Sequence, residues 1–310
     1  MIVRDLALAT VTVAGDRLDD VAAVYQEAFG WAVRWEGLLD PALAAAWGIA
    51  PARRRVLLLG ANGETRGLVR LVEGETPPPP PLATFGWSAL EITVRDCDRM
   101  AERLRGHPRF RVNGEPRDLR FSADPPGQRA MQAVGPAGEQ FYLTQVVRQT
   151  PGRELAVPPP GAEVGAVFIA VLAAPDYNAA KAFYVDVLGC APDIDGNEVA
   201  LSVARKELGL PEGTRFLLGA LRPLGETRIE LDGYPPGVGR VRERHPGELP
   251  PGFGVASLLV TDLERAVHHA HARGYRVLAP PVPIDEPPYA GRRSVTVVGG
   301  AGELVELIGE

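Results

Sequence analysis

Hydrophobic alternation and helical periodicity follow one another in the same order along the whole chain. The first unit begins with an alternating, β-branched stretch at 6–13, followed by apolar residues at helical spacing over 16–29. Gly30 suits the end of that helix, and strand-like runs follow at 55–59 and 67–72. We interpret the unit as β-α-β-β-β and expect it four times.

The remaining units repeat this pattern, with Pro-rich runs between them that have few amide donors for a helix or sheet. The predicted strands lie at 89–94, 130–134, 140–146, 167–173, 215–221, 228–231, 255–260, 294–298 and 304–308. The predicted helices lie at 97–104, 177–188 and 263–273, with short ones at 41–47 and 199–208.

Sequence matches between the two halves indicate an internal duplication. The segments 25–30, 63–66 and 134–139 recur in the same order at nearly constant spacing, as 184–189, 225–228 and 298–303. We therefore predict an N-terminal two-module domain at 1–147, a linker at 148–163 and a C-terminal two-module domain at 164–310. Both halves should have the same topology.

The composition narrows the functional classes. The chain has 310 residues, 45% of them hydrophobic, and a net charge of −6. This balance gives no general attraction to nucleic acid or anionic lipid, so we expect neither partner. No apolar run approaches the roughly 18 residues of a membrane span, and the N-terminus lacks the zones of a signal peptide, so we expect a cytoplasmic protein. A homodimer is left open.

The repeated unit and two short motifs resemble a known family. Phe-Tyr-x-x-x-Leu-Gly at 183–189 and Gly-x-x-x-Glu-Leu at 302–307 are similar to motifs of the vicinal oxygen chelate superfamily, which includes glyoxalases, ring-cleaving dioxygenases and bleomycin-binding proteins. The resemblance implies an α+β fold of four β-α-β-β-β modules, paired into two concave mixed-sheet cups. It also implies a small-molecule ligand.

In metal-dependent members of that family, His, Glu or Gln on the inner strands hold a divalent ion. Carried onto this sequence, the positions of the N-terminal cup are Ala9 or Thr10, Leu68 or Arg70, Ala89 and Tyr142. Those of the C-terminal cup are Ile169, Glu230, Val255 and Glu306. We therefore expect no cofactor and no tightly bound metal, with Glu230 and Glu306 as weak candidates for a hard cation.

The five histidines support the same expectation, because none lies on a predicted cup strand. His107 and His245 precede prolines in turns, whereas His268 and His271 are spaced to share a helix face. That pair is either an adventitious metal site or a solvated helix surface.

Strand alternation predicts the lining of the N-terminal cup. Leu90, Ile92 and Val94 should pack outward, which would turn Trp87 and Glu91 inward. By the same parity we expect Gln140, Tyr142 and Arg70 on the inner face. They would bind a small polar aromatic ligand, or Glu91 and Arg70 would form a structural ion pair in a cup without function.

In the C-terminal cup, the alternation places Arg228, Glu230, Ser257 and Glu306 on the inner face. If Glu230 and Glu306 lie close together, one of them would have its pKa raised by the other and by burial, as a general base near neutrality requires. Two functions remain open. One is a protein that binds a small molecule, and the other is a lyase, isomerase or dioxygenase-like enzyme that uses Glu230, Glu306 and Glu91.

Overall fold

The computed structural model describes residues 2–119, 127–152 and 154–309, which form four modules in sequence. The first comprises β1 (Val3–Ala14), α1 (Leu18–Phe29), β2 (Ala32–Leu38), α2 (Pro41–Ala46), β3 (Arg55–Gly60) and β4 (Leu68–Gly74). The second comprises β5 (Gly86–Val94), α3 (Cys97–Arg105), β6 (Arg111–Leu119), β7 (Gln128–Val134) and β8 (Gln140–Val146). The predicted β-α-β-β-β unit is therefore confirmed for this half.

The second half repeats the element order of the first. Its third module comprises β9 (Val164–Ala174), α4 (Tyr177–Ala182), a π-helical turn (Phe183–Val187), β10 (Ala191–Val199), α5 (Ser202–Glu207), β11 (Phe216–Arg222) and β12 (Arg228–Gly233). Its fourth comprises β13 (Gly252–Val260), α6 (Leu263–Ala272), β14 (Val282–Pro283), β15 (Arg293–Val298) and β16 (Leu304–Gly309). The predicted α+β class of four modules is confirmed.

The hydrophobic pattern did not predict four strands, and all four lie at sheet edges. They are β2, β6, β10 and β14, the second strand of each module. Their side chains are mostly exposed or half-buried, so they lack the alternation of a strand with one buried face. Bulges in the pairing of β2, β6 and β10 interrupt the period further.

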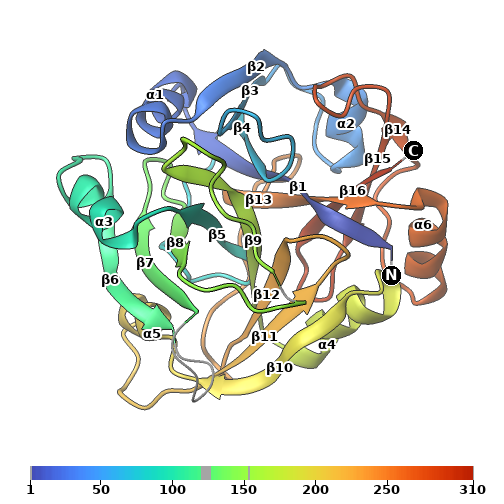
Figure 1. The fold of residues 1–310 in the computed structure, drawn as a ribbon. Helices are drawn as coiled ribbons and strands as arrows, with labels where there is room; N and C mark the ends of the chain where they lie inside the picture. The colour runs from blue at the N-terminus through green and yellow to red at the C-terminus, as the bar shows by residue number, and fades with distance from the viewer. Residues whose placement is uncertain (1, 120–126, 153, 310) are drawn as a thin grey trace.

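Each cup is built from modules of different halves of the chain. One sheet has the order β14-β15-β16-β13-β1-β4-β3-β2, and the other β10-β11-β12-β9-β5-β8-β7-β6 (Figure 1). The prediction that each half closes its own cup is therefore wrong. The first module pairs with the fourth through β1 and β13, and the second pairs with the third through β5 and β9. Because all four first strands have similar patterns, the sequence did not reveal which of them pair.

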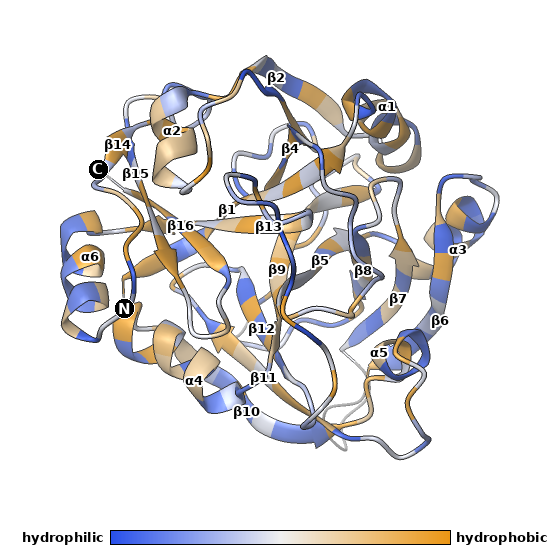
Figure 2. Ribbon diagram, turned by 180° about the vertical axis from the view of Figure 1, so that it is seen from behind, coloured by the Kyte–Doolittle hydropathy of each residue, from blue (hydrophilic) through white to orange (hydrophobic). Residues whose placement is uncertain are grey.

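The two sheets share one hydrophobic core between their convex faces. This core includes residues of β1, β13, β5 and β9, together with the buried sides of α1, α3, α4 and α6. Helices α1 and α3 lie at one side of the molecule and α4 and α6 at the other, as both ribbon views show (Figures 1 and 2). The concave faces of the sheets consequently point away from each other.

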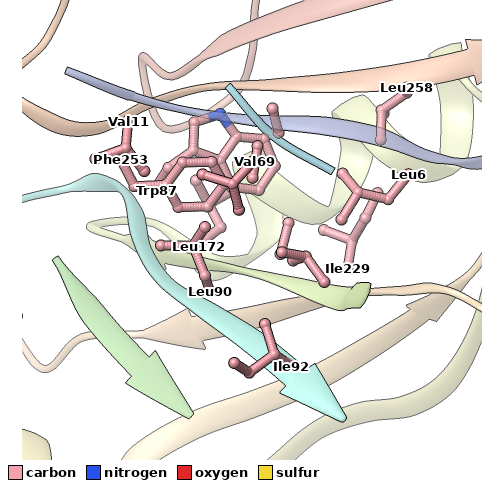
Figure 3. Packing of buried hydrophobic residues seen from close by; sticks show 14 of the residues in the cluster. Leu6, Val11, Val69, Trp87, Leu90, Ile92, Leu172, Ile229, Phe253 and Leu258 are labelled. Atoms are coloured by element: carbon pink, nitrogen blue, oxygen red, sulfur yellow. The ribbon is translucent and has the colours of Figure 1, made fainter. Parts of the chain in front are cut away.

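Trp87 belongs to this central core and not to a cup. A bulge between Trp87 and Ala89 shifts the strand by one residue, so the indole lies on the same face as Leu90. Its ring packs 5.5 Å from that of Phe253, and its N–H donates to the carbonyl of Leu304 over 2.7 Å (Figure 3). The prediction that Trp87 faces into a cup is therefore wrong.

The motifs that repeat between the halves meet each other in space. The hydroxyl of Tyr25 donates to Glu139 over 2.6 Å, and that of Tyr184 donates to Glu303 over the same distance. Both carboxylates are buried. The paired motifs thus join the first module to the second and the third to the fourth, while the strand pairing joins the halves.

The described residues between β8 and β9 form no helix or strand. The predicted division at 148–163 remains a prediction, because nothing tests whether each half folds alone. Within the described residues, no helix is long and apolar enough to cross a membrane.

Candidate functional site

The two cups can be compared position by position because their central strands pair in the same way. Thr10 of β1 pairs with Val255, and Val171 of β9 pairs with Ala89, with a bulge immediately beyond each pair. The neighbouring strands then supply the remaining equivalent positions. One cup presents Thr10, Arg70, Ser257 and Glu306, and the other presents Val171, Glu230, Glu91 and Tyr142.

A buried arginine fills the first of these, which we call the closed cup. Arg70 donates to Glu306 over 2.5 Å, to Thr10 over 3.0 Å and to Ser257 over 3.2 Å. A second carboxylate, Glu286, accepts from it over 3.1 Å. Arg70 is 1% exposed, so its charge is neutralised entirely inside the protein.

Glu306 is held in its charged form by these contacts. Burial alone would raise its pKa, but the charge of Arg70 and the hydroxyl donors of Ser257 and Ser294 outweigh burial and lower the pKa. The indole of Trp47, at the end of α2, donates to Glu306 and lies over the Arg70 guanidinium, 4.5 Å from its carbon. Trp47 therefore closes this cup against solvent.

The second cup, which we call the acidic cup, contains carboxylates that form no ion pair with the described residues. It contains Glu91 and Tyr142 from the second module and Glu230 and Asp232 from the third. Glu91 accepts from the hydroxyl of Thr144. Glu91 and Asp232 are 4% and 1% exposed, whereas Glu230 is more exposed than either.

These carboxyl groups shift one another's protonation. Burial raises the pKa of Glu91 to about 7. Burial, together with the charge of Glu91, raises that of Asp232 to about 8. The pKa of Glu230 is raised well above its usual value by loss of solvent and by the charges of Asp232 and Glu91. Burial and the same charges raise the pKa of the Tyr142 phenol as well.

Two buried acceptors in this cup have no hydrogen-bond partner within the described part of the chain. They are Oδ1 of Asp232 and Oε1 of Gln132. Their side chains are 1% and 6% exposed, and a buried acceptor left unpaired costs roughly 1–3 kcal/mol. The acidic cup therefore has hydrogen-bonding capacity that the protein itself does not satisfy.

The covering of the two cups also differs. Leu208 ends α5 as Trp47 ends α2, but it has no indole N–H and packs with the cluster that includes Leu82 and Tyr234. Leu155 and Ala156 pack against another part of the acidic cup, beside Tyr142. An aliphatic side chain thus replaces the tryptophan that closes the other cup.

Glu230 and Glu306, which the sequence placed in one cup, lie in different sheets. The prediction that one of them raises the pKa of the other is wrong. Arg70 lowers the pKa of Glu306, while burial and the charges of Asp232 and Glu91 raise that of Glu230. The alternative of a structural ion pair between Arg70 and Glu91 is wrong in its partner, since Arg70 pairs with Glu306 and Glu286.

Three of the expected ligand positions also lie two residues before the positions that the strand pairing gives. The positions that pair with the fourth strand of each module are Glu91, Val171 and Ser257, in place of Ala89, Ile169 and Val255. Sequence alone could not fix this register because each strand continues in hydrophobic alternation on both sides.

The other predicted contact residues have partners of their own. Gln140 uses its amide hydrogens on the carbonyls of Ala133 and Phe141, and its oxygen accepts from Asn113. Arg228 is 4% exposed and donates to Asp193 over 2.9 Å. Both therefore stabilise the edges of the acidic cup, and whether they contact a ligand stays a prediction.

Sequence reasoning missed Trp47, Glu286 and Gln132. Trp47 and Glu286 come from segments outside the inner strands, and Gln132 lies in a strand whose partner β6 was not predicted. Their contribution depends on which modules pair, so no local pattern indicated it.

Neither cup fits the divalent ion of metal-dependent relatives. In the closed cup, the guanidinium of Arg70 already supplies a positive charge among the equivalent side chains. In residues 2–119, 127–152 and 154–309, no group of three or more His, Cys, Asp or Glu side chains could hold a metal ion. These residues include the carboxyl groups of the acidic cup and the histidines of α6.

Removing one member of the closed cup's ion pair should destabilise the protein strongly. Arg70→Met leaves Glu306 buried without a counter-charge and should lower the free energy of unfolding by about 3–5 kcal/mol. The double variant Arg70→Met, Glu306→Leu should recover part of this loss, because Glu286 still lacks its partner. Urea denaturation measures both, with Arg55→Met, which breaks half-exposed surface pairs, as a control expected to cost much less stability than Arg70→Met. A double variant no more stable than the single one would contradict the account.

The raised pKa values of the acidic cup predict how stability depends on pH. The folded protein keeps protons on Glu91 and Asp232 that the unfolded chain releases near its ordinary values of 4.5 and 3.8. These groups therefore lower the free energy of unfolding as pH rises from about 4 to 8. Glu91→Gln with Asp232→Asn should flatten this slope, so the variant should gain free energy of unfolding relative to the native protein at pH 8.5 and not at pH 4. Thermal unfolding across pH measures it, and a slope unchanged from the native protein would refute it.

Comparisons with known proteins agree with this architecture. Residues 166–292 match the family described as the Glyoxalase/Bleomycin resistance protein/Dioxygenase superfamily. Glyoxalase I from Zea mays is similar in structure, with a TM-score of 0.64 and 18% identity over 98% of this chain and 92% of that chain. A protein from Bacillus subtilis subsp. subtilis str. 168, provisionally named a dioxygenase, has a TM-score of 0.64 and 14% identity over 99% and 85% of the two chains.

At these identities the two structures show a common fold alone. No curated protein matches the sequence of the chain. The family match places residues 166–292 in the glyoxalase, bleomycin resistance protein and dioxygenase superfamily, also called the vicinal oxygen chelate superfamily, and the four-module fold of the chain agrees with that match.

Proposed function

We propose that the chain binds a small organic molecule in the acidic cup and does so without a tightly bound metal. The observation that carries this proposal is the contrast between the cups. Arg70 pairs with both carboxylates of the closed cup, whereas no ion pair with Glu91, Glu230 or Asp232 is found in the described part of the chain. Unpaired buried acceptors occur in both cups, on Glu286 and Thr296 in the closed cup and on Asp232 and Gln132 in the acidic cup. A ligand with hydrogen-bond donors would satisfy those of the acidic cup and would recover the free energy that their burial costs.

The charge of the cup favours a ligand with a positive group. Three carboxyl groups share the site. Burial raises the pKa of each, neighbouring carboxylate charges raise those of Glu230 and Asp232 further, and no ion pair with any of the three is found among the described residues. Arg70 occupies the position in the closed cup that Glu230 occupies here. An amidinium or ammonium group on the ligand would therefore take the place that the guanidinium takes in the other cup, while Tyr142 supplies an aromatic wall.

Benzamidine is a suitable probe because its planar cation resembles the head of an arginine. Titration followed by NMR should show saturable binding of benzamidine, and neutral benzamide of nearly the same shape should bind at least about tenfold more weakly. Glu230→Gln should reduce the affinity for benzamidine by about tenfold, because it removes the more exposed carboxylate of the cup.

Glu212→Gln makes the same charge change at an exposed site outside the cup and is the matched control. Equal affinity for the charged and neutral probes would contradict the proposed charge preference. Signal changes confined to residues outside the acidic cup would contradict the proposed location.

A second candidate function is acid/base catalysis in the same cup. It is favoured by one observation, the pKa of Glu91 near 7, which lets a carboxylate accept and return a proton at neutral pH. In such a reaction Glu91 removes a proton from a carbon next to a carbonyl group and later returns it. A lyase or an isomerase would both use this step.

Exchange of carbon-bound protons for deuterium in dihydroxyacetone tests this second function directly. The rate should rise as pH passes through about 7, and Glu91→Gln should lower it by roughly 100-fold. Binding of benzamidine with no exchange above the buffer rate would favour a protein that only binds its ligand.

A further inference from the structure

A cavity lies apart from both cups and is bordered by three arginines. It has a volume of about 270 Å³, and its walls include Arg242, Arg244 and Arg276. Segments from β5, β13 and β16 contribute to it, while Glu91, Tyr142, Glu230 and Asp232 do not. We propose that this cavity binds the oxyanion group, a carboxylate or a phosphate, of a small organic molecule.

Arg242 is a positive charge held in place without a carboxylate. Its guanidinium donates to the carbonyls of Phe253 over 2.6 Å and Trp87 over 2.5 Å, and its Nε donates to Thr84 over 3.0 Å. Burial lowers its pKa to about 10. Carbonyl dipoles orient such a group but do not neutralise it, so a bound anion would stabilise it further.

The other two arginines add charge at the mouth of the cavity. Arg244 and Arg276 are both exposed, and burial of the Arg244 guanidinium together with the charge of Arg276 lowers the pKa of Arg244. No ion pair of these three arginines with a carboxylate is found in the described part of the chain. Three cations around one small space, without a carboxylate partner among the described residues, attract an anion.

Glu303 is the acidic residue on the cavity wall, and its carboxylate is already engaged. It accepts from the hydroxyl of Tyr184 over 2.6 Å and from the amide of Ala301 over 2.8 Å. Burial raises its pKa, while the hydrogen bonds from Tyr184 and the backbone amides oppose that shift. Glu303 therefore does not serve as the counter-ion of the arginines.

The remaining walls indicate what the anionic group is attached to. Phe85, Trp87, Val298 and Leu304 line the same cavity, so apolar surface faces the arginines. A volume of about 270 Å³ lies just below the usual range for drug-sized ligands. A single aromatic ring with one carboxylate or phosphate is of suitable size.

Phenyl phosphate, benzoate and inorganic phosphate are the probes for this site, with benzyl alcohol as the neutral comparison. NMR titration of the full chain should show saturable shifts of the Trp87 indole N–H with phenyl phosphate or benzoate, and at least about tenfold weaker binding of benzyl alcohol. A stronger effect of phenyl phosphate than of benzoate would identify a phosphate site, and the reverse a carboxylate site. If inorganic phosphate bound as strongly as phenyl phosphate, the proposed contribution of the apolar wall to binding would be contradicted.

The double variant Arg244→Gln, Arg276→Gln should weaken phenyl phosphate binding by about tenfold or more without unfolding the protein, because both side chains are exposed. Arg265→Gln, an exposed change on α6 away from the cavity, should leave it unchanged. Equal affinities in the double variant and the native protein, or no shift of the Trp87 signal with any anion, would overturn the proposal.

Discussion

The antiparallel pairing of first strands, β1 with β13 and β5 with β9, is the constraint on which the rest of the structure depends. It joins the beginning of the chain to its last quarter and leaves the two middle modules to pair with each other. Neither cup exists within one half, because each needs strands from both. The same pairing brings equivalent residues, Trp87 and Phe253, into contact in the shared core between the sheets.

One position then decides the chemistry of each cup. Arg70 and Glu230 occupy equivalent places on β4 and β12. The arginine at this place balances the charge of the buried Glu306, and the indole of Trp47 lies over it. The glutamate at this place adds a negative group to a cup that already contains other carboxyl groups. Duplicated modules with the same backbone can therefore give one cup that is filled by its own side chains and one that is not.

Most of the fold was predictable from the sequence, and much of the site was not. The repeated periodicity predicted the four modules, and outward packing of Leu90, Ile92 and Val94 is confirmed. The edge strands were not predicted because they have no buried face. Trp87 was placed on the wrong face because the alternation of residues along the sequence does not reveal a bulge. The partners of Glu230 and Glu306 depend on pairing between distant modules, which no local pattern specifies.

The closed cup also explains how the acidic cup can be tolerated. Buried carboxyl groups that repel one another cost free energy, and a functional site of this kind has to be supported by the stability of its surroundings. Here both cups are attached to a single core, so the well-packed closed cup and the two Tyr–Glu hydrogen bonds stabilise the same unit that contains the acidic cup. A duplication that leaves one cup structural can therefore free the other to keep unpaired charge.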